Sequence, residues 1–348
     1  MSHDLHNCYL PPAYAHLLET FGPAHPLRRT VLPLDDQTPA SGELADPLGE
    51  EEHTPCRGLI HTYPDKVLLL ATLDCAVRCQ YCTRRRLIKN HTFKGMVYGN
   101  RTPLLPAKHG ELRTGSRGKP FASKRWKIPN EVFQYLENHT EIRDVLISGG
   151  DPLMLPDEEL DELFSNVWNV SHIRTVRLGT KIPAVMPERV TPELAALLAK
   201  HRIWLQLHFV HPAELTAESR LALATLAEAG VPMVSQTVLL KGINDDADTL
   251  TDLFYGLLEN RVKPYYLFQC DPVLGSSSFR TPVQKGLDLM KALQGRVSGL
   301  ALPNFCIDAP GGGGKIVLHP DTVLRRDGGD ILLTNYEGNE YRYPDVPE

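Results

Sequence analysis

From His61 onward, short apolar runs alternate with amphipathic helical patterns, and this alternation constrains the fold more than any other feature of the 348-residue chain. Nearly continuous apolar strands joined by helices are typical of a parallel sheet that helices cover. Six or seven such units, without a dinucleotide-type glycine fingerprint, favour a barrel over a Rossmann sheet. We therefore predict an α/β fold, a partial (β/α)6-type TIM barrel with N-terminal and C-terminal extensions. The expected strands cover residues 67–73, 145–148, 175–179, 203–209, 234–240, 265–269 and 305–308.

Three helix boundaries follow from start and stop signals. Asp157 stands before an apolar stripe with i, i+3, i+4 spacing and is a candidate N-cap. Thr216 is expected to open a helix that Gly230 ends. Thr281 precedes Pro282, which places a cap residue before a proline at the first helical position.

The chain divides into three parts by composition. Residues 1–60 form an N-terminal extension, partly helical around residues 14–21, to which no chemistry can be assigned. The barrel core covers residues 61–318, and residues 319–348 form a C-terminal tail. A basic insertion at about 89–127, with ten Lys and Arg against one Glu, interrupts the core. We favour a mobile, solvated insertion over a lid or a patch for an anionic partner, because a charge run alone is weak evidence.

Composition excludes several classes of protein. The chain is 42% hydrophobic with a net charge of −5, which is typical of a soluble globular protein and disfavours a nucleic-acid-coating role. No apolar run approaches the roughly 18 to 20 residues that a membrane helix needs, and the first residues lack a secretory pattern. The seven cysteines, three of them within eight residues, indicate bound metal in a reducing compartment, so we expect a cytoplasmic protein.

The three crowded cysteines, Cys75, Cys79 and Cys82, follow the first expected strand with C-x3-C-x2-C spacing. Thiolates select iron–sulfur clusters, zinc or copper(I), and structural zinc sites normally close with four ligands. Three ligands on a four-iron cube leave one iron open to a substrate or cofactor. Buried structural thiols or zinc ligands are the weaker alternatives. The other four cysteines are scattered: Cys8, Cys56, Cys270 and Cys306.

The cysteine spacing, with Tyr81 just before the third cysteine, resembles the radical S-adenosylmethionine (radical SAM) superfamily, so the barrel is expected to be of the radical SAM kind. The resemblance implies a [4Fe–4S] cluster whose open iron is chelated by the methionine moiety of S-adenosylmethionine. The run Ser148-Gly149-Gly150-Asp151 ends the second expected strand and resembles the superfamily's glycine-rich motif, whose backbone meets the methionine amino group. Taken by itself, this run is equally typical of a strand-end turn.

A second motif, Asp308-Ala-Pro-Gly-Gly-Gly-Gly-Lys315, lies near the end of the barrel pattern. It is not a phosphate-binding P-loop, because Ile316 follows the lysine. A flexible loop with a surface lysine is the simplest interpretation of this run alone. A lysine on a pliant loop at a barrel mouth is also suited to a Schiff base with pyridoxal phosphate, because the glycines let it swing away.

Together these motifs resemble the lysine 2,3-aminomutase family, whose segments occur in the same order from about residue 61 to 317. Segments that carry the resemblance include HTYPDKVLLL, CTRRR, RDVLISGGD, WLQLHFVHP, VKPYYLFQCD and DAPGGGGK. The resemblance implies that Lys315 forms the Schiff base with pyridoxal phosphate. It implies that Asp271 and Asp308 pair with the substrate's ε-ammonium group. Arg84, the first of three consecutive arginines, matches the position that holds the substrate carboxylate, and the other two are expected to support it.

Some positions depart from the family pattern. Lys66 stands where the family commonly has an arginine near the cofactor phosphate, and it supplies a point charge without a fork. Ser235 replaces an amide side chain near S-adenosylmethionine, and we place its neighbour Gln236 among the cofactor-binding residues. The cysteine-rich zinc tail of the family is missing here, so Cys270 is expected to lack zinc partners.

The resemblance implies an isomerase that interconverts L-lysine and L-β-lysine, with an electron donor such as flavodoxin or ferredoxin and a homo-oligomeric state. Three alternatives stay open. The substrate is arginine, or lysine destined for elongation factor P modification; the enzyme acts on a macromolecule docked by the basic insertion; or the chain is a non-catalytic metal-binding scaffold. Neither a membrane nor nucleic acid is expected as a partner.

Overall fold

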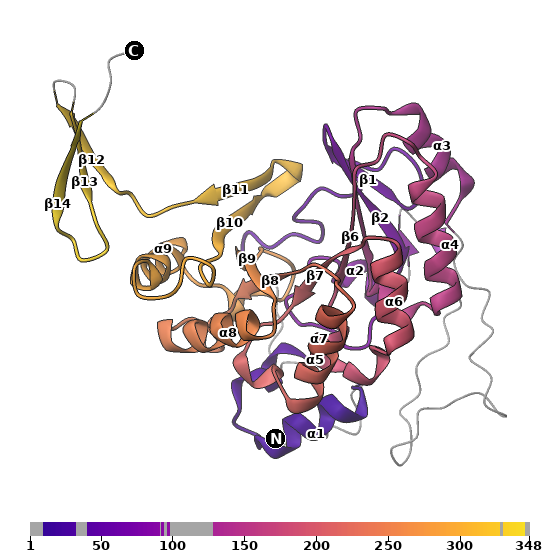
Figure 1. Ribbon diagram of the computed structural model, residues 1–348, viewed down its shortest axis with the longest axis horizontal. Helices are drawn as coiled ribbons and strands as arrows, with labels where there is room; N and C mark the ends of the chain where they lie inside the picture. Colours follow the sequence, from indigo (N-terminus) through magenta and orange to yellow (C-terminus); the bar gives the residue numbers. More distant parts are fainter. Residues whose placement is uncertain are drawn as a thin grey trace.

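The computed structural model describes residues 10–32, 40–90, 92–93, 96–97, 128–327 and 330–344. Within them the main sheet has nine strands, in the order β1-β2-β5-β6-β7-β8-β9-β10-β11 (Figure 1). The strands β2 to β10 of this sheet run parallel to their neighbours, which confirms the predicted barrel-like α/β fold. Antiparallel strands β1 and β11, absent from the prediction, form its two edges. The bounds are β1 (Leu59–Tyr63), β2 (Lys66–Thr72), β5 (Asp144–Gly149), β6 (Thr175–Thr180), β7 (Trp204–His208), β8 (Met233–Leu239), β9 (Lys263–Gln269), β10 (Asn304–Ala309) and β11 (Gly314–Leu318).

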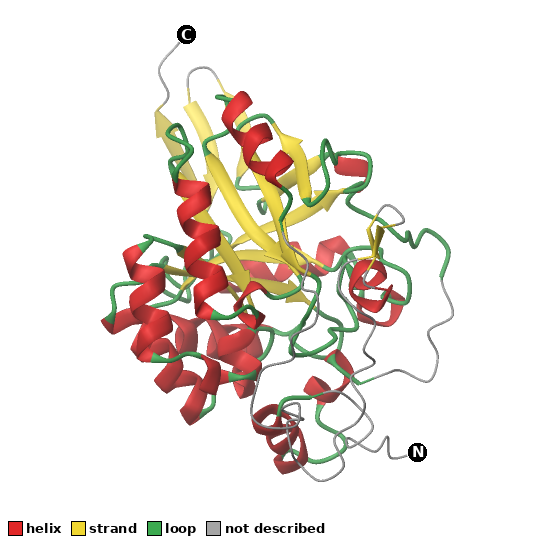
Figure 2. Cartoon of the chain, turned by 90° about the vertical axis from the view of Figure 1, so that its right-hand side faces the viewer, coloured by secondary structure: helices red, strands yellow, loops and turns green. Residues whose placement is uncertain are grey.

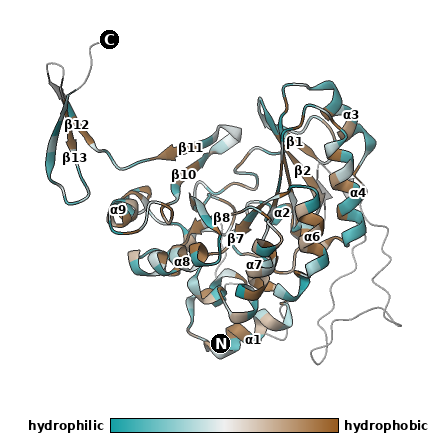
Figure 3. Cartoon of the chain, viewed as in Figure 1, coloured by the Kyte–Doolittle hydropathy of each residue, from teal (hydrophilic) through white to brown (hydrophobic). Residues whose placement is uncertain are grey.

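Helices cover the outer face of this sheet, as Figure 2 shows. Residues alternate along each strand: on β5, Val145 and Ile147 are buried toward the helices, whereas Leu146 and Ser148 line the inside of the sheet. Figure 3 shows both hydrophobic and hydrophilic residues on α6 and α8, as expected for helices with one face on the core. The α-helices are α1 (Pro12–Thr20), α2 (Arg85–Asn90), α3 (Asn130–Asn138), α4 (Asp157–Trp168), α5 (Ile182–Val185), α6 (Pro192–Lys200), α7 (Ala217–Glu228), α8 (Ala247–Glu259) and α9 (Val283–Leu293).

Of the three predicted helix boundaries, one is confirmed and two are shifted. Thr216 caps α7 by accepting a hydrogen bond from the backbone N–H of Ser219 at 3.2 Å, and Gly230 follows the helix with a φ of 81°. Asp157 is itself the first residue of α4 and gives no side-chain cap. Pro282, and not Thr281, precedes the first residue of α9; the Thr281 carbonyl instead accepts a hydrogen bond from the Gln269 amide at 2.6 Å.

The N-terminal extension packs against the barrel. The helix expected around residues 14–21 is α1, and its Tyr14 and Leu18 are buried in the main core. The Tyr14 hydroxyl donates to Glu214 at 2.9 Å, 200 residues further along the chain. The extension is therefore part of the structural core, although its boundary at residue 60 stays a prediction.

The last described residues form a separate three-stranded antiparallel sheet of β12 (Val323–Asp327), β13 (Asp330–Thr334) and β14 (Glu340–Pro344), which extends from β11 in Figure 1. Tyr336, in the turn between β13 and β14, contacts Gly295 just after α9. The basic insertion lies mostly outside the described residues; the structure gives only the end of α2 and the short strands β3 (Thr92–Phe93) and β4 (Met96–Val97). None of the helices in the described ranges is long and apolar enough to cross a bilayer.

Candidate active site

The inside of the curved sheet is a cavity of about 580 Å³. Side chains from all nine strands of the main sheet line it, which requires the sheet to wrap around the space. A cavity of this size is in the range of about 300 to 1,000 Å³ that holds cofactors and small ligands. The predicted site residues converge on it: Cys75, Cys79, Cys82, Lys66, Tyr81, Arg84, Ser148, Gly149, Gly150, Asp151, Gln236, Asp271, Asp308 and Lys315.

The cysteine loop follows β2 and brings all three predicted thiols to one end of the cavity. Burial raises the pKa of Cys79 to about 11 and also raises the pKa values of Cys75 and Cys82. Cys75 and Cys79 each lie close enough to another of the three cysteines for the negative charge of that neighbour to contribute to the rise in pKa. Three partly buried soft donors fit an iron–sulfur cluster, whose positive irons would displace the thiol protons. No three His, Cys, Asp or Glu side chains of the described residues converge on one ion, but cluster ligands bind different irons.

The glycine-rich motif packs directly against the start of the cysteine loop. The N–H of Gly150 donates to the Thr72 carbonyl at 2.6 Å, and the N–H of Asp151 donates to the Asp74 carbonyl at 2.7 Å. A Cβ atom at Gly149 would lie 2.2 Å from the Thr72 carbonyl oxygen, and one at Gly150 would lie 2.2 Å from that of Asp74. Both glycines are therefore required by close backbone packing, and the motif and the loop form one unit.

The other residues predicted to bind the cofactor differ in what they contact. The buried Asp151 carboxylate accepts hydrogen bonds from Thr180 Oγ1 and the Lys181 N–H, both at 2.7 Å, so it fixes neighbouring strand ends. Gln236 lines the cavity, as expected. Ser235 is fully buried and does not line the cavity, because successive strand residues point to opposite faces. The amide side chain at the cavity is that of Gln236, so the serine at position 235 does not change the cavity wall.

A buried ion pair that sequence inspection missed lies beside the cysteines. Lys181 Nζ is 2.6 Å from Glu214 Oε1, and Glu214 also accepts from the backbone N–H of Val210 at 2.7 Å. His208, at the end of β7, also lines the cavity, and burial lowers its pKa to about 4, so it is neutral. These residues could have been predicted from their positions, because each is a charged or polar residue at or soon after the end of an expected strand. In a barrel, the catalytic residues lie at these strand ends.

Lys315 lies at the other end of the cavity, on a strand and not on the pliant loop that its glycines indicated. It is the second residue of β11 and pairs in register with Asp308 of β10. Its Nζ atom is 2.9 Å from Asp308 Oδ1, and its backbone N–H donates to the Tyr63 hydroxyl at 2.8 Å. The glycines form the turn of this hairpin, where Gly311 has a φ of 70° and Gly312 one of 83°.

Asp271 follows β9 and lines the same end of the cavity. Burial, and then the charge of Asp308, raises the pKa of Asp271 to about 7. The two carboxylates are thus close enough to interact, as the prediction of a pair required. Lys66 also lines the cavity, where its Nζ is 3.1 Å from Asp65 and 4.8 Å from the centre of the Tyr63 ring.

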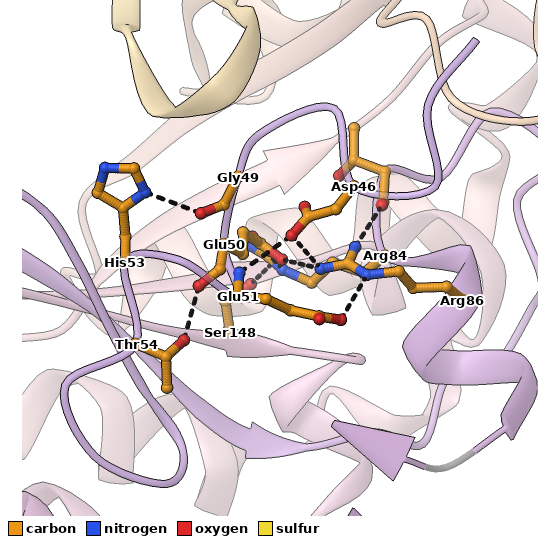
Figure 4. Close-up of polar contacts among 10 residues, drawn as sticks. Asp46, Gly49, Glu50, Glu51, His53, Thr54, Arg84, Arg86 and Ser148 are labelled. Carbon is orange, nitrogen blue, oxygen red and sulfur yellow. Dashed lines mark hydrogen bonds and ion pairs between the residues drawn. The ribbon is translucent and has the colours of Figure 1, made fainter. Parts of the chain in front are cut away.

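Arg84 is the member of the arginine triplet that reaches the cavity. Its Nε and Nη2 atoms lie 2.8 and 2.7 Å from Glu50 Oε1, and its Nη1 donates to Ser148 Oγ at 3.1 Å (Figure 4). Arg86 supports the same region through Asp46, at 2.8 Å. Glu50 belongs to the extension to which the sequence assigned no chemistry, so its place in the site was missed.

Comparison with known proteins agrees with this geometry. Residues 69–253 match the sequence profile of the radical SAM superfamily, and residues 290–348 match a profile described as lysine-2,3-aminomutase. The L-lysine 2,3-aminomutase of Acetoanaerobium sticklandii is 37% identical over 97% of this chain and 75% of its own length. That of Clostridium subterminale is 38% identical over 94% and 73%. The glutamate 2,3-aminomutase of Clostridioides difficile is 35% identical over 97% and 74%.

Among solved structures, "His6 tagged anSMEcpe with bound AdoMet" aligns with a TM-score of 0.44 at 13% identity, over 65% of this chain and 56% of that one. The fold together with the profile match over residues 69–253 defines a radical SAM enzyme, a class that implies a [4Fe–4S] cluster and S-adenosylmethionine. Within that class, the chain belongs to the lysine 2,3-aminomutase family and is an isomerase of the aminomutase type.

Proposed function

We propose that this enzyme interconverts L-lysine and L-β-lysine by moving the α-amino group to carbon 3. The observation that carries the proposal is the pair of carboxylates, Asp271 and Asp308, at the end of the cavity that holds Lys315. A buried ammonium group needs opposite charge and hydrogen-bond acceptors, and this pair supplies both. Glutamate would bring a third negative charge to the same place, so the carboxylate pair favours lysine over glutamate.

The residues present fit the groups that this reaction requires. Cys75, Cys79 and Cys82 would hold the cluster, and the backbone at Gly150 would meet S-adenosylmethionine. Lys315 is a primary amine on the cavity wall, suited to pyridoxal phosphate, and Lys66 supplies a cation for a phosphate at the same wall. When bound, the cluster and S-adenosylmethionine supply a carbon-centred radical, and pyridoxal phosphate supplies the aldehyde that carries the migrating nitrogen.

The chain's own residues orient the substrate. The Arg84 guanidinium binds the α-carboxylate, and the two aspartates bind the ε-ammonium group, so lysine is held at both ends. Lys315 Nζ pairs with Asp308 at 2.9 Å in the structure. The ε-ammonium group of the substrate would carry the same charge to Asp308 as Lys315 Nζ does in the structure, so the partly buried carboxylate would have a cationic partner with either group.

The proposal is tested by product analysis. The protein is reconstituted anaerobically with iron, sulfide and pyridoxal phosphate, then incubated with a reductant, S-adenosylmethionine and lysine, arginine or glutamate in separate reactions. We expect β-lysine from lysine, and no β-isomer from any of the three with Lys315→Ala. A β-isomer of glutamate or arginine, without one of lysine, would overturn the substrate assignment. Cleavage of S-adenosylmethionine without any β-isomer would favour a macromolecular substrate.

A further inference from the structure

Residues 46–54 of the N-terminal extension contact two separate parts of the active site, and we call this segment the clasp. The clasp lies between the arginine triplet and the glycine turn that leads to Lys315. Leu48 and Glu50 line the cavity. Figure 4 shows Glu50 directed at Arg84 and His53 at the clasp's own backbone. Neither the sequence motifs nor the proposed reaction accounts for this arrangement.

The first contact is between Glu50 and Arg84. The Glu50 side chain is 5% exposed and that of Arg84 15%, so the ion pair is shielded from water. Glu50 Oε1 accepts from Nε and forms an ion pair with Nη2, and Ser148 Oγ accepts from Nη1. These contacts use three of the five N–H donors of the guanidinium group and leave two for a ligand. Since an arginine side chain otherwise samples many rotamers, Glu50 fixes the direction in which those two donors point.

The second contact is between the clasp backbone and the glycine turn. The N–H of Gly311 donates to the Pro47 carbonyl at 3.0 Å. A Cβ atom at Gly49 would lie 2.9 Å from the carbonyl carbon of Gly311, and one at Gly312 would lie 2.2 Å from the His53 ring. His53 Nδ1 is in turn 2.8 Å from the Gly49 carbonyl oxygen, which holds the ring in place. The clasp therefore braces the turn from which the Lys315 strand starts.

We propose that the clasp is a positioning element and that Glu50 orients Arg84 toward the substrate carboxylate. The inference rests on the proposed function, in which Arg84 and Lys315 act on the two substituents of the same α-carbon. Their relative placement decides whether the amino acid is held in a reactive geometry. One segment that contacts both Arg84 and the turn before Lys315 sets that placement directly. Glu50 acts through Arg84 and is not itself in contact with the reacting atoms.

The test compares Glu50→Ala with Glu50→Gln in the full-length, reconstituted enzyme. Alanine removes the acceptor, so Arg84 keeps its charge but loses its direction. We expect kcat to fall about 10- to 100-fold, the range associated with misplacement by about 1 Å, while KM changes less than about threefold. Glutamine keeps an acceptor oxygen and should restore kcat to within about threefold of wild type. Arg84→Ala, which removes the charge itself, should instead raise KM.

Glu52→Ala is the matched control, because Glu52 lies in the same segment with an exposed side chain. It should match wild type in kcat and KM. Bound iron and pyridoxal phosphate trapped by borohydride are measured for every variant and should not change in Glu50→Ala, whereas its melting temperature should fall, because the shielded Arg84 charge is left without its partner. Wild-type kcat in Glu50→Ala, an equal loss in Glu52→Ala, or failure of glutamine to rescue would overturn the role of Glu50. The absence of any β-isomer from the wild-type enzyme with all three amino acids would overturn the proposed function as well.

Discussion

The two ends of the cavity are held together by different forces. At the cysteine end, backbone hydrogen bonds of 2.6 and 2.7 Å and close-packed glycines join the loop to the end of β5, and the buried Lys181–Glu214 pair lies beside them. At the amino-acid end, the side chains proposed to bind the substrate are held by ion pairs: Lys315 with Asp308, and Arg84, which follows the cysteine loop, with Glu50. Backbone packing allows one arrangement, whereas an ion pair can exchange one partner for another of like charge. The first end is thus suited to a resident cofactor and the second to a substrate that enters and leaves.

The difference has consequences for substitution. At the cysteine end, a single change should act on structure and cofactor content together, because no alternative arrangement is available. At the amino-acid end, a change should alter affinity, rate or pH dependence while the fold persists. Substitutions with matched controls separate the two kinds of effect.

The largest effect is expected at the cysteines. Cys79→Ala removes one of the three thiols, and a cube held by two ligands should not persist, so bound iron and turnover should both be lost. Iron content per chain and β-lysine formation after anaerobic reconstitution measure this. Cys56→Ala is the control, since Cys56 is a free thiol that does not line the cavity. Wild-type iron content in Cys79→Ala would show that the cysteine loop is not the cluster site.

A substitution in the glycine motif should have the next largest effect. In Gly150→Ala the new methyl would lie 2.2 Å from the Asp74 carbonyl oxygen, which is backbone and must move. We expect a loss of about 1–3 kcal/mol in the free energy of unfolding, measured by urea denaturation of the apoprotein, together with lower iron content.

Gly299→Ala controls for the added methyl itself, because no atom lies within 4 Å of a Cβ built at Gly299. It should leave both the free energy of unfolding and the iron content near wild type. Equal stability of the two variants would show that the contact between the motif and the loop is less rigid than the structure indicates.

The difference between local backbone packing and long-range ion pairs also explains which parts of the site could be predicted from the sequence. The cysteine loop and the Ser148-to-Asp151 run are short local motifs that follow adjacent strands, and the strand pattern brings them together. All seven predicted parallel strands are present, because continuous apolar runs mark them. Lys315 was identified as a site residue but was assigned to a loop, since four glycines indicate flexibility more strongly than a following strand.

The clasp, in contrast, could not be predicted. Glu50 is one acidic residue among several in a proline-rich extension, and its partner Arg84 lies 34 residues away. The contact between Tyr14 and Glu214 spans 200 residues. Nothing in residue type or spacing selects such pairs, because they follow from how the extension packs on the finished barrel. Long-range ion pairs are the part of this site that needed the structure.

The smallest effect is expected from the charge state of Asp271. Burial and the charge of Asp308 raise its pKa to about 7, so lysine meets two carboxylates above pH 7 and one below. We expect kcat/KM for lysine to rise with pH through about 7 and to level off above it. In Asp271→Asn, kcat/KM should be lower at pH 8 and this rise should disappear.

The effect of Asp271 on stability has the opposite sign. Because its folded-state pKa exceeds that of the unfolded chain, the native state binds the proton more tightly and loses stability as pH rises from about 4 to 7. The unliganded Asn variant should therefore melt above wild type at pH 8 and lack this loss. A wild-type rise that persists in Asp271→Asn would assign the titrating group to another residue and leave the ammonium site with Asp308 alone.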